Sequence, residues 1–149
     1  MRSRQDGFTL VELLAVLVIV AIMGGLVAAN FGARRGREAL QATAYEMASR
    51  FRAARTAAIR EASEQTVVID MGNRVVTAGR ATAPLKIADT VNITSETSAT
   101  EQRAPRIAGV RFFPNGQSTG GKVRLETGRQ AYEVRINWLT GRVAVERVP

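Results

Sequence analysis

The chain has 149 residues and contains neither cysteine nor histidine. A disulfide framework, a thiolate nucleophile and a cysteine-ligated metal are therefore excluded, and the commonest general base and metal ligand of proteins is missing as well. The formal charge of +8 comes mostly from arginine, and such a surplus indicates an acidic partner, anionic lipid or nucleic acid.

The apolar residues are concentrated near the N-terminus. Between residues 8 and 31 Glu12 is the single charged side chain, and residues 13–33 carry no charge at all. About 20 apolar residues in an α-helix span the hydrocarbon core of a bilayer, and this segment reaches that length. It exceeds the roughly 7–15 apolar residues of a secretory signal. We therefore expect a transmembrane helix over residues 8–33.

Glu12 distinguishes this segment from three simpler alternatives. These are a secretory signal cut after Ala29, a plain membrane anchor and a buried core helix. An unpaired carboxylate in hydrocarbon costs roughly 2.5–3.5 kcal/mol even on the scales most lenient to charge. A sequence that keeps Glu12 in its most apolar segment therefore predicts a cationic partner, either flanking arginines or a newly formed N-terminal amine.

Residues 7–12 read Gly-Phe-Thr-Leu-Val-Glu. They resemble the processing site of type IV pilins and type II secretion pseudopilins. The resemblance implies that a prepilin peptidase cuts after Gly7, which removes residues 1–7 as a leader, and that the new N-terminal Phe8 is methylated. Glu12 would then neutralise the amine of a neighbouring subunit in an apolar filament core and set the register between helices.

After residue 33 the sequence becomes amphipathic. One apolar stripe recurs at alternating spacings of four and three residues, which predicts a helix. Its members are Leu40, Ala44, Met47, Phe51, Ala54 and Ala58. Because residues 8–64 contain no proline, we expect one continuous helix in which residues 34–64 continue into a head domain. Arg50, Arg52 and Arg55 lie off the stripe and are expected to face solvent, and the small stripe residues favour packing on a sheet over a coiled coil.

From residue 65 the apolar period changes to two, which predicts a mostly antiparallel β-rich head over residues 65–149. The expected strands are residues 66–71, 74–77, 107–113, 122–127, 131–137 and 142–148. Gly72 and Asn73 are typical of a two-residue hairpin turn, whereas residues 95–106 lack periodicity and are expected to form a flexible loop. The predicted fold class is therefore α+β, with a long helix packed on an antiparallel head as in pilins.

Residues 110–121 combine a strand, a Pro-Asn-Gly turn, a Ser/Thr stretch and a Gly-Gly pair before the next strand. They resemble the C-terminal region of GspH-type minor pseudopilins, and residues 140–143 resemble the closing hairpin of that family. The resemblance implies a non-enzymatic subunit at the tip of a periplasmic pseudopilus, which drives export of folded proteins across the outer membrane. A minor type IV pilin and a DNA-binding pilin-like protein of the DNA-uptake machinery remain alternatives.

The resemblance also implies partners and a location. Other major and minor pseudopilins, the prepilin peptidase and an inner-membrane assembly platform are the expected partners. The chain would cross the bacterial inner membrane once, with the N-terminus in the cytoplasm and the head in the periplasm.

No catalytic residue, metal or cofactor is predicted, since the carboxylates form neither a spaced acid/base pair nor a ligand loop. The larger aromatic residues are expected in the core or on sheet faces. They are Phe112, Phe113, Tyr132 and Trp138. Arg135 and Arg142 are the positions where a weak nucleic-acid contact is expected, because alternating arginines on strands can present a basic face to phosphate. Arginine is equally typical of protein interfaces, so assembly explains these residues as well.

Overall fold

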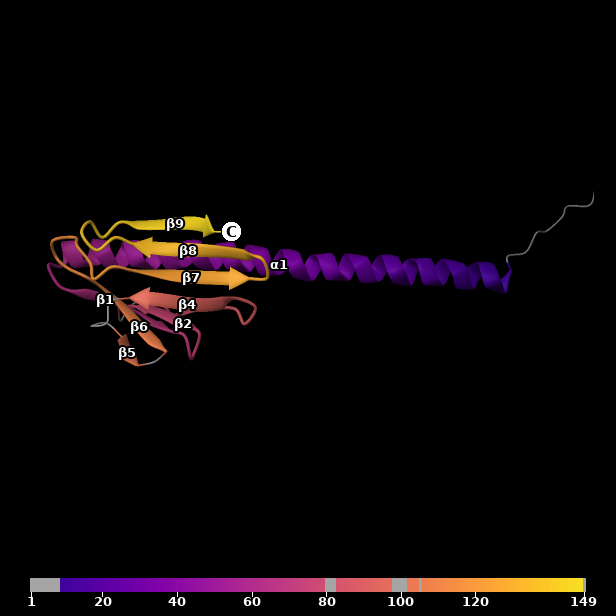
Figure 1. The fold of residues 1–149 in the computed structure, drawn as a ribbon, viewed down its shortest axis with the longest axis horizontal. Coiled ribbons are helices and arrows are strands. Elements are labelled where there is room, and N and C mark those ends of the chain that lie inside the picture. The colour runs from indigo at the N-terminus through magenta and orange to yellow at the C-terminus, as the bar shows by residue number, and fades with distance from the viewer. Residues whose placement is uncertain (1–8, 80–82, 98–101, 105, 149) are drawn as a thin grey trace, which may run out of the picture. The chain divides into compact units, whose positions relative to one another are not determined.

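The computed structural model describes residues 9–79, 83–97, 102–104 and 106–148, and within residues 28–35 and 102–104 it describes the backbone alone. The chain divides into two units, Met1–Arg35 and Gly36–Pro149, and helix α1 (Leu10–Arg60) contributes to both (Figure 1). In the first unit, Leu10–Val27 has a mean hydropathy of 2.8 and none of it is buried. By length and composition this segment is able to cross a membrane.

Helix α1 ends at Arg60, four residues before the predicted end at residue 64. Ala62 adopts a left-handed conformation with φ of +50°, and the Ser63 N–H donates to the Ala58 carbonyl oxygen at 3.2 Å. A left-handed residue followed by this backward hydrogen bond is the geometry that commonly terminates helices. The apolar stripe contains no signal for it, since glycine, the usual residue at that position, is absent.

Within the described residues the strands form two antiparallel sheets, of orders β3-β2-β1-β6-β5 and β4-β7-β8-β9 (Figure 1). Their bounds are β1 Gln65–Asp70, β2 Val75–Ala78, β3 Leu85–Lys86, β4 Asn92–Thr97, β5 Gln102–Ala104, β6 Ile107–Phe112, β7 Gly121–Thr127, β8 Gln130–Ile136 and β9 Val143–Val148. The β-rich, antiparallel head predicted from the period of two is confirmed.

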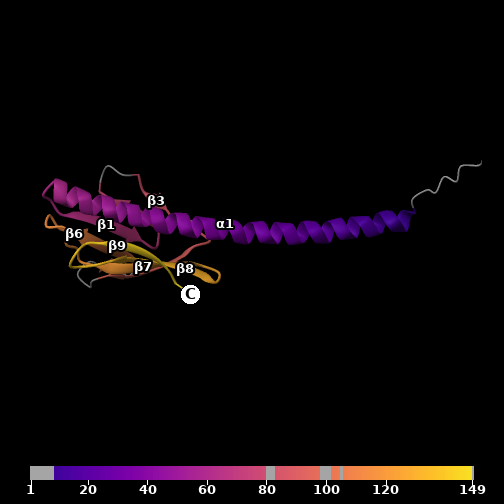
Figure 2. The ribbon, with the colours of Figure 1, turned by 90° about the horizontal axis from the view of Figure 1, so that it is seen from above.

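Residues 36–60 of α1 pack against both sheets and close the core (Figure 2). All six residues of the predicted stripe are buried. The ring of Phe51 lies 6.3 Å from that of Phe112 in the first sheet, while Tyr45 lies 6.4 Å from Tyr132 in the second. One helix therefore joins two sheets that share a single core with it.

Arg50 does not face solvent as predicted. Its side chain is 13% exposed, donates to the Ala83 carbonyl oxygen and forms an ion pair with Glu46 at 2.9 Å. The segment after β2 brings the Ala83 carbonyl to this side of α1, so a position off the apolar stripe is covered by chain far away in the sequence.

The prediction of a flexible loop over residues 95–106 is wrong for its described part. Residues 95–97 belong to β4 and residues 102–104 to β5, and both are edge strands of their sheets. β4 carries Thr, Ser and Glu around Ile93, its one aliphatic residue. Edge strands keep polar side chains on a solvated face, so the apolar alternation that marks central strands is missing.

The first hairpin also differs from its prediction. Asp70 pairs with Val75, so residues 71–74 form a four-residue turn in place of the predicted two-residue turn. The Asp70 carboxylate accepts hydrogen bonds from the Asn73 backbone N–H at 2.8 Å and from its side chain at 2.7 Å. These two bonds lower the pKa of Asp70 and hold the longer turn closed.

Candidate functional site

The N-terminus of α1 holds the first group of predicted site residues. Gly7 and Phe8 lie outside the described residues. Thr9 caps the helix. Its carbonyl oxygen accepts hydrogen bonds from the backbone N–H groups of Glu12 at 3.1 Å and Leu13 at 3.2 Å. Its side-chain Oγ1 accepts a further hydrogen bond from the Glu12 backbone N–H at 3.3 Å. Thr9 and Glu12 thus occupy the Ncap and N3 positions, the spacing of a capping box.

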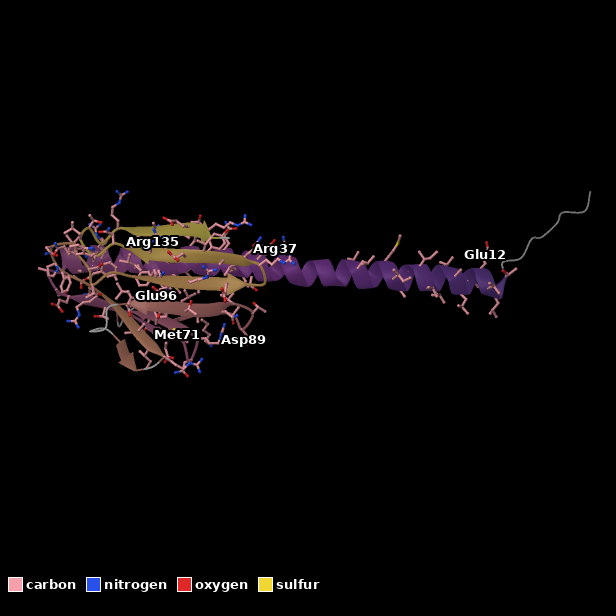
Figure 3. All side chains as sticks on the ribbon, viewed as in Figure 1. Glu12, Arg37, Met71, Asp89, Glu96 and Arg135 are labelled. Carbon is pink, nitrogen blue, oxygen red and sulfur yellow. The ribbon has the colours of Figure 1, made fainter. Side chains whose placement is uncertain are left out.

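Glu12 is surrounded by exposed apolar side chains (Figure 3). Residues 10–27 of α1 expose large aliphatic groups throughout, from 49% at Val16 to 78% at Leu10. Within the described part of the chain, no cation lies within ion-pair distance of the Glu12 carboxylate. An apolar surface of this extent marks contact with lipid or with other proteins, and the carboxylate sits where such contact would remove it from water.

Arg135 lies on the outward face of the second sheet, where cations and carboxylates alternate (Figure 3). Strand alternation places on this face the described charges Lys122, Arg124, Arg135, Glu96, Glu126, Glu133 and Glu146. Arg135 contacts Glu133 at 2.7 Å and Glu146 at 3.3 Å, and Lys122 contacts Glu96 at 3.1 Å. This face therefore carries three cations and four carboxylates, so it is not a basic surface of the kind that binds phosphate.

The Arg135–Glu133 contact has an electrostatic consequence. The side-chain hydrogen bond from Arg135 lowers the pKa of the Glu133 carboxyl and raises that of the guanidinium. Glu133 is 8% exposed, so its charge is held inside the sheet surface by this cation. The expected weak nucleic-acid contact at Arg135 stays a prediction.

Arg142 lies in a different environment, in the loop between β8 and β9. It borders a hollow of about 370 Å³ together with Arg52 and Arg55 of α1. The structure does not place Arg135 in this hollow, so the two predicted arginines belong to different surfaces. Sequence reasoning missed the three-arginine cluster because Arg142 lies about ninety residues beyond Arg52 and Arg55 in the sequence.

Trp138 is not a core or sheet-face residue as predicted, because 64% of it is exposed. The Asn137 side-chain oxygen accepts from the backbone N–H groups of Leu139 at 3.0 Å and Thr140 at 2.9 Å. This cap forms a tight turn after β8 and points residues 138–139 outward. Among the described residues, Asp and Glu side chains nowhere gather in groups of three that could hold a metal ion.

The chain is similar in sequence to known secretion components. The prokaryotic N-terminal methylation motif matches residues 2–28, and the family described as type II transport protein GspH matches residues 43–141. A curated relative, type II secretion system protein H of Xanthomonas campestris pv. campestris, is 29% identical over 143 residues, which cover 95% of this chain and 83% of the relative.

Solved structures show the same fold. The minor pseudopilin EpsH from the type 2 secretion system of Vibrio cholerae has a TM-score of 0.58 at 14% identity, over 72% of this chain and 95% of that one. The type IV minor pilin FimU of Pseudomonas aeruginosa has a TM-score of 0.55 at 17% identity, over 74% of this chain and 90% of that one. The pilin-like fold predicted from the sequence is therefore confirmed, and the fold is shared by pseudopilins and pilins.

Proposed function

Since this chain belongs to the GspH family of type II transport proteins, we propose that, as a minor pseudopilin, it joins the tip of a periplasmic pseudopilus that drives export of folded proteins across the outer membrane. The observation that carries this proposal is the exposed apolar length of α1 with Glu12 at its start. A helix of this kind is suited to move from lipid into a bundle of similar helices.

Processing precedes assembly in this proposal. A prepilin peptidase cuts after Gly7, and Phe8 becomes the methylated N-terminus. The match of the N-terminal methylation motif to residues 2–28 supports this step. The N-terminus then lies on the cytoplasmic side of the inner membrane and the head in the periplasm, where an assembly platform and the other pseudopilins are the partners. The chain itself carries out no chemistry.

Glu12 then pairs with the amine of a neighbouring subunit. Cleavage creates an ammonium group, and in an apolar filament core an isolated ammonium or carboxylate is expensive to bury. Pairing them removes both penalties and specifies one axial register, because a shifted neighbour would leave two charges unpaired.

Helix capping is a competing explanation of Glu12. At the N3 position a glutamate side chain can accept a hydrogen bond from the backbone N–H of the Ncap residue, which is Thr9 here. A glutamine side chain can accept the same hydrogen bond. Glutamine carries no charge. Replacement by glutamine therefore separates the two roles, since it preserves the cap and removes the ion pair.

The experiment compares Glu12→Leu and Glu12→Gln with the wild-type chain. Both variants should insert in the membrane and be processed normally, and N-terminal mass spectrometry checks that each begins with methylated Phe8. Neither should co-purify with the other pseudopilins from membranes or support secretion, because breaking a buried ion pair costs roughly 3–5 kcal/mol.

A processed Glu12→Gln variant that assembles and secretes like the wild type would assign Glu12 to capping and refute the pairing. A mature chain that begins at Asn30 would refute the processing step, since it would show an ordinary secretory signal.

A further inference from the structure

The last turns of α1 and the loop between β8 and β9 lie at the same end of the head (Figures 1 and 2). Residues from both segments border one hollow. Its volume is about 370 Å³, and it is bordered by Arg52, Arg55, Thr56, Gly141, Arg142 and Val143. Two guanidinium groups come from the helix and the third from the loop. We call this site the basic hollow.

The two helix arginines are held in place by backbone carbonyl groups that lie far away in the sequence, one at the start of β9 and one in the loop between β6 and β7. Arg52 Nη2 donates to the Val143 carbonyl oxygen at 3.2 Å, and Arg55 Nε donates to the Gly116 carbonyl oxygen at 3.0 Å. Each guanidinium has five N–H donors in a fixed plane, so these single bonds orient the group and leave donors for a ligand.

At the basic hollow, the backbone of Gly141 packs closely against Gly116 and Arg55. Gly141 has φ of +61°, and a Cβ atom there would lie 2.2 Å from the Gly116 oxygen and 2.8 Å from Arg55 Nε. Only glycine allows the loop to approach Arg55 this closely. The close approach of Gly141 therefore fixes the loop against Arg55.

The positive charge of the basic hollow is not balanced within the described part of the chain. No described Asp or Glu forms an ion pair with Arg52, Arg55 or Arg142. Six other cations of the head do have such partners, in the pairs Arg50–Glu46, Arg74–Asp89, Arg111–Glu64, Lys122–Glu96, Arg124–Glu126 and Arg135–Glu133. Three clustered guanidinium groups without a carboxylate favour an anionic group from another molecule.

Exposed apolar side chains lie on the same loop and the same helix as the arginines of the basic hollow. Trp138 and Leu139 precede Gly141 in the same loop and are 64% and 52% exposed, and Ile59, 47% exposed, follows Arg55 by one turn of α1. Ile59 and Arg55 are both neighbours of Gly116, since a Cβ atom there would lie 3.3 Å from each side chain. Tryptophan and arginine together are typical of the residues that dominate protein–protein binding energy.

We propose that the basic hollow is the docking site for an acidic segment of another pseudopilin of the same system. A carboxylate of that segment binds among the three guanidinium groups, and an adjacent apolar side chain packs on Trp138 and Leu139. The inference rests on the proposed assembly function and assigns to it a contact surface in the head. A DNA duplex is disfavoured, because its phosphate backbone offers no apolar group to pack on Trp138 and Leu139.

The test uses charge reversal in the full-length chain, purified from membranes in mild detergent with its partner pseudopilins. The variants are Arg142→Glu alone and the double variant Arg52→Glu with Arg142→Glu. The matched control is Arg129→Glu with Arg147→Glu, which makes the same change in net charge at exposed positions outside the basic hollow. Arg142→Glu alone is included because it is expected to fold normally, since the Arg142 side chain holds no described loop in place.

A photo-crosslinking amino acid at Leu139 identifies what docks there. We expect both hollow variants to recover at least about tenfold less partner pseudopilin than the control. The reason is that like charges placed together at an interface lower the binding affinity by more than a factor of about ten. The crosslink should map to a partner segment containing Asp or Glu, and an acid-to-arginine change in that segment should restore binding to Arg142→Glu.

Equal recovery with the hollow variants and the control would overturn the proposal, and so would a crosslink to a segment without carboxylates. Hollow variants that assemble normally but lose binding to duplex DNA or to anionic lipid vesicles would also overturn it, in favour of a phosphate ligand. Failure of the assembly function itself is distinguishable, because the wild-type chain would then co-purify with no pseudopilin.

Discussion

Replacement of Gly141 by alanine tests whether the β8–β9 loop approaches Arg55 as closely as the structure shows. Gly128, in the turn between β7 and β8, is a matched control. The two glycines have nearly the same left-handed φ, +61° and +57°, but a Cβ atom at Gly128 would meet nothing within 4 Å. Both alanine variants therefore incur the conformational penalty, and only Gly141→Ala incurs the clash.

The magnitudes follow from these contacts. Alanine in the left-handed region costs about 1–2 kcal/mol, which is the whole effect expected for Gly128→Ala. At Gly141 the new Cβ would lie 2.2 Å from the Gly116 oxygen, so the loops must separate and the Arg55–Gly116 hydrogen bond is lost. A hydrogen bond to a charged group contributes about 1.5–3 kcal/mol. The total for Gly141→Ala is then about 2.5–5 kcal/mol.

Urea unfolding of the full chain in mild detergent measures this difference. Trp138 is the single tryptophan and lies in the affected loop, so its fluorescence reports local separation, while circular dichroism reports unfolding of the sheets. Gly141→Ala should also weaken partner binding at the basic hollow, and Gly128→Ala should not. Equal free energies of unfolding for the two variants would refute the close approach.

Two further predictions concern the core and the sheet surface. Phe51→Ala should destabilise the head by about 3–5 kcal/mol in the same urea assay, because its ring is fully buried against Phe112, whereas Ile59→Ala on the exposed side of α1 should change it by less than about 1 kcal/mol. The lowered pKa of Glu133 stabilises the fold above the ordinary carboxyl pKa of about 4.3, and this contribution is lost as the pH falls through the lowered value. Glu133→Gln and Arg135→Leu should both flatten the decline of the melting temperature in acid, and an unchanged decline would show that the Glu133–Arg135 contact has no role in stability.

The sequence by itself determined those features that depend on neighbours along the chain. The length of the apolar segment before residue 33 is sufficient to predict a membrane helix, and the spacing from Leu40 to Ala58 identifies the buried side of α1. The central strands alternate strongly enough to be found, because one face of each is buried. The motif at residues 7–12 is a run of six consecutive residues, so it needed no tertiary information to be recognised.

Tertiary structure alone decided what depends on residues far apart in the sequence. Edge strand β4 forms because β7 pairs with it, although its own side chains carry no apolar alternation. Glu146 contacts Arg135 only because β8 and β9 align in register. The basic hollow brings Arg52 to Val143, which are 91 positions apart. Local periodicity indicates which side of a helix or strand is buried. Packing between segments far apart in the sequence decides which groups lie beside each charged side chain, and such packing forms the basic hollow.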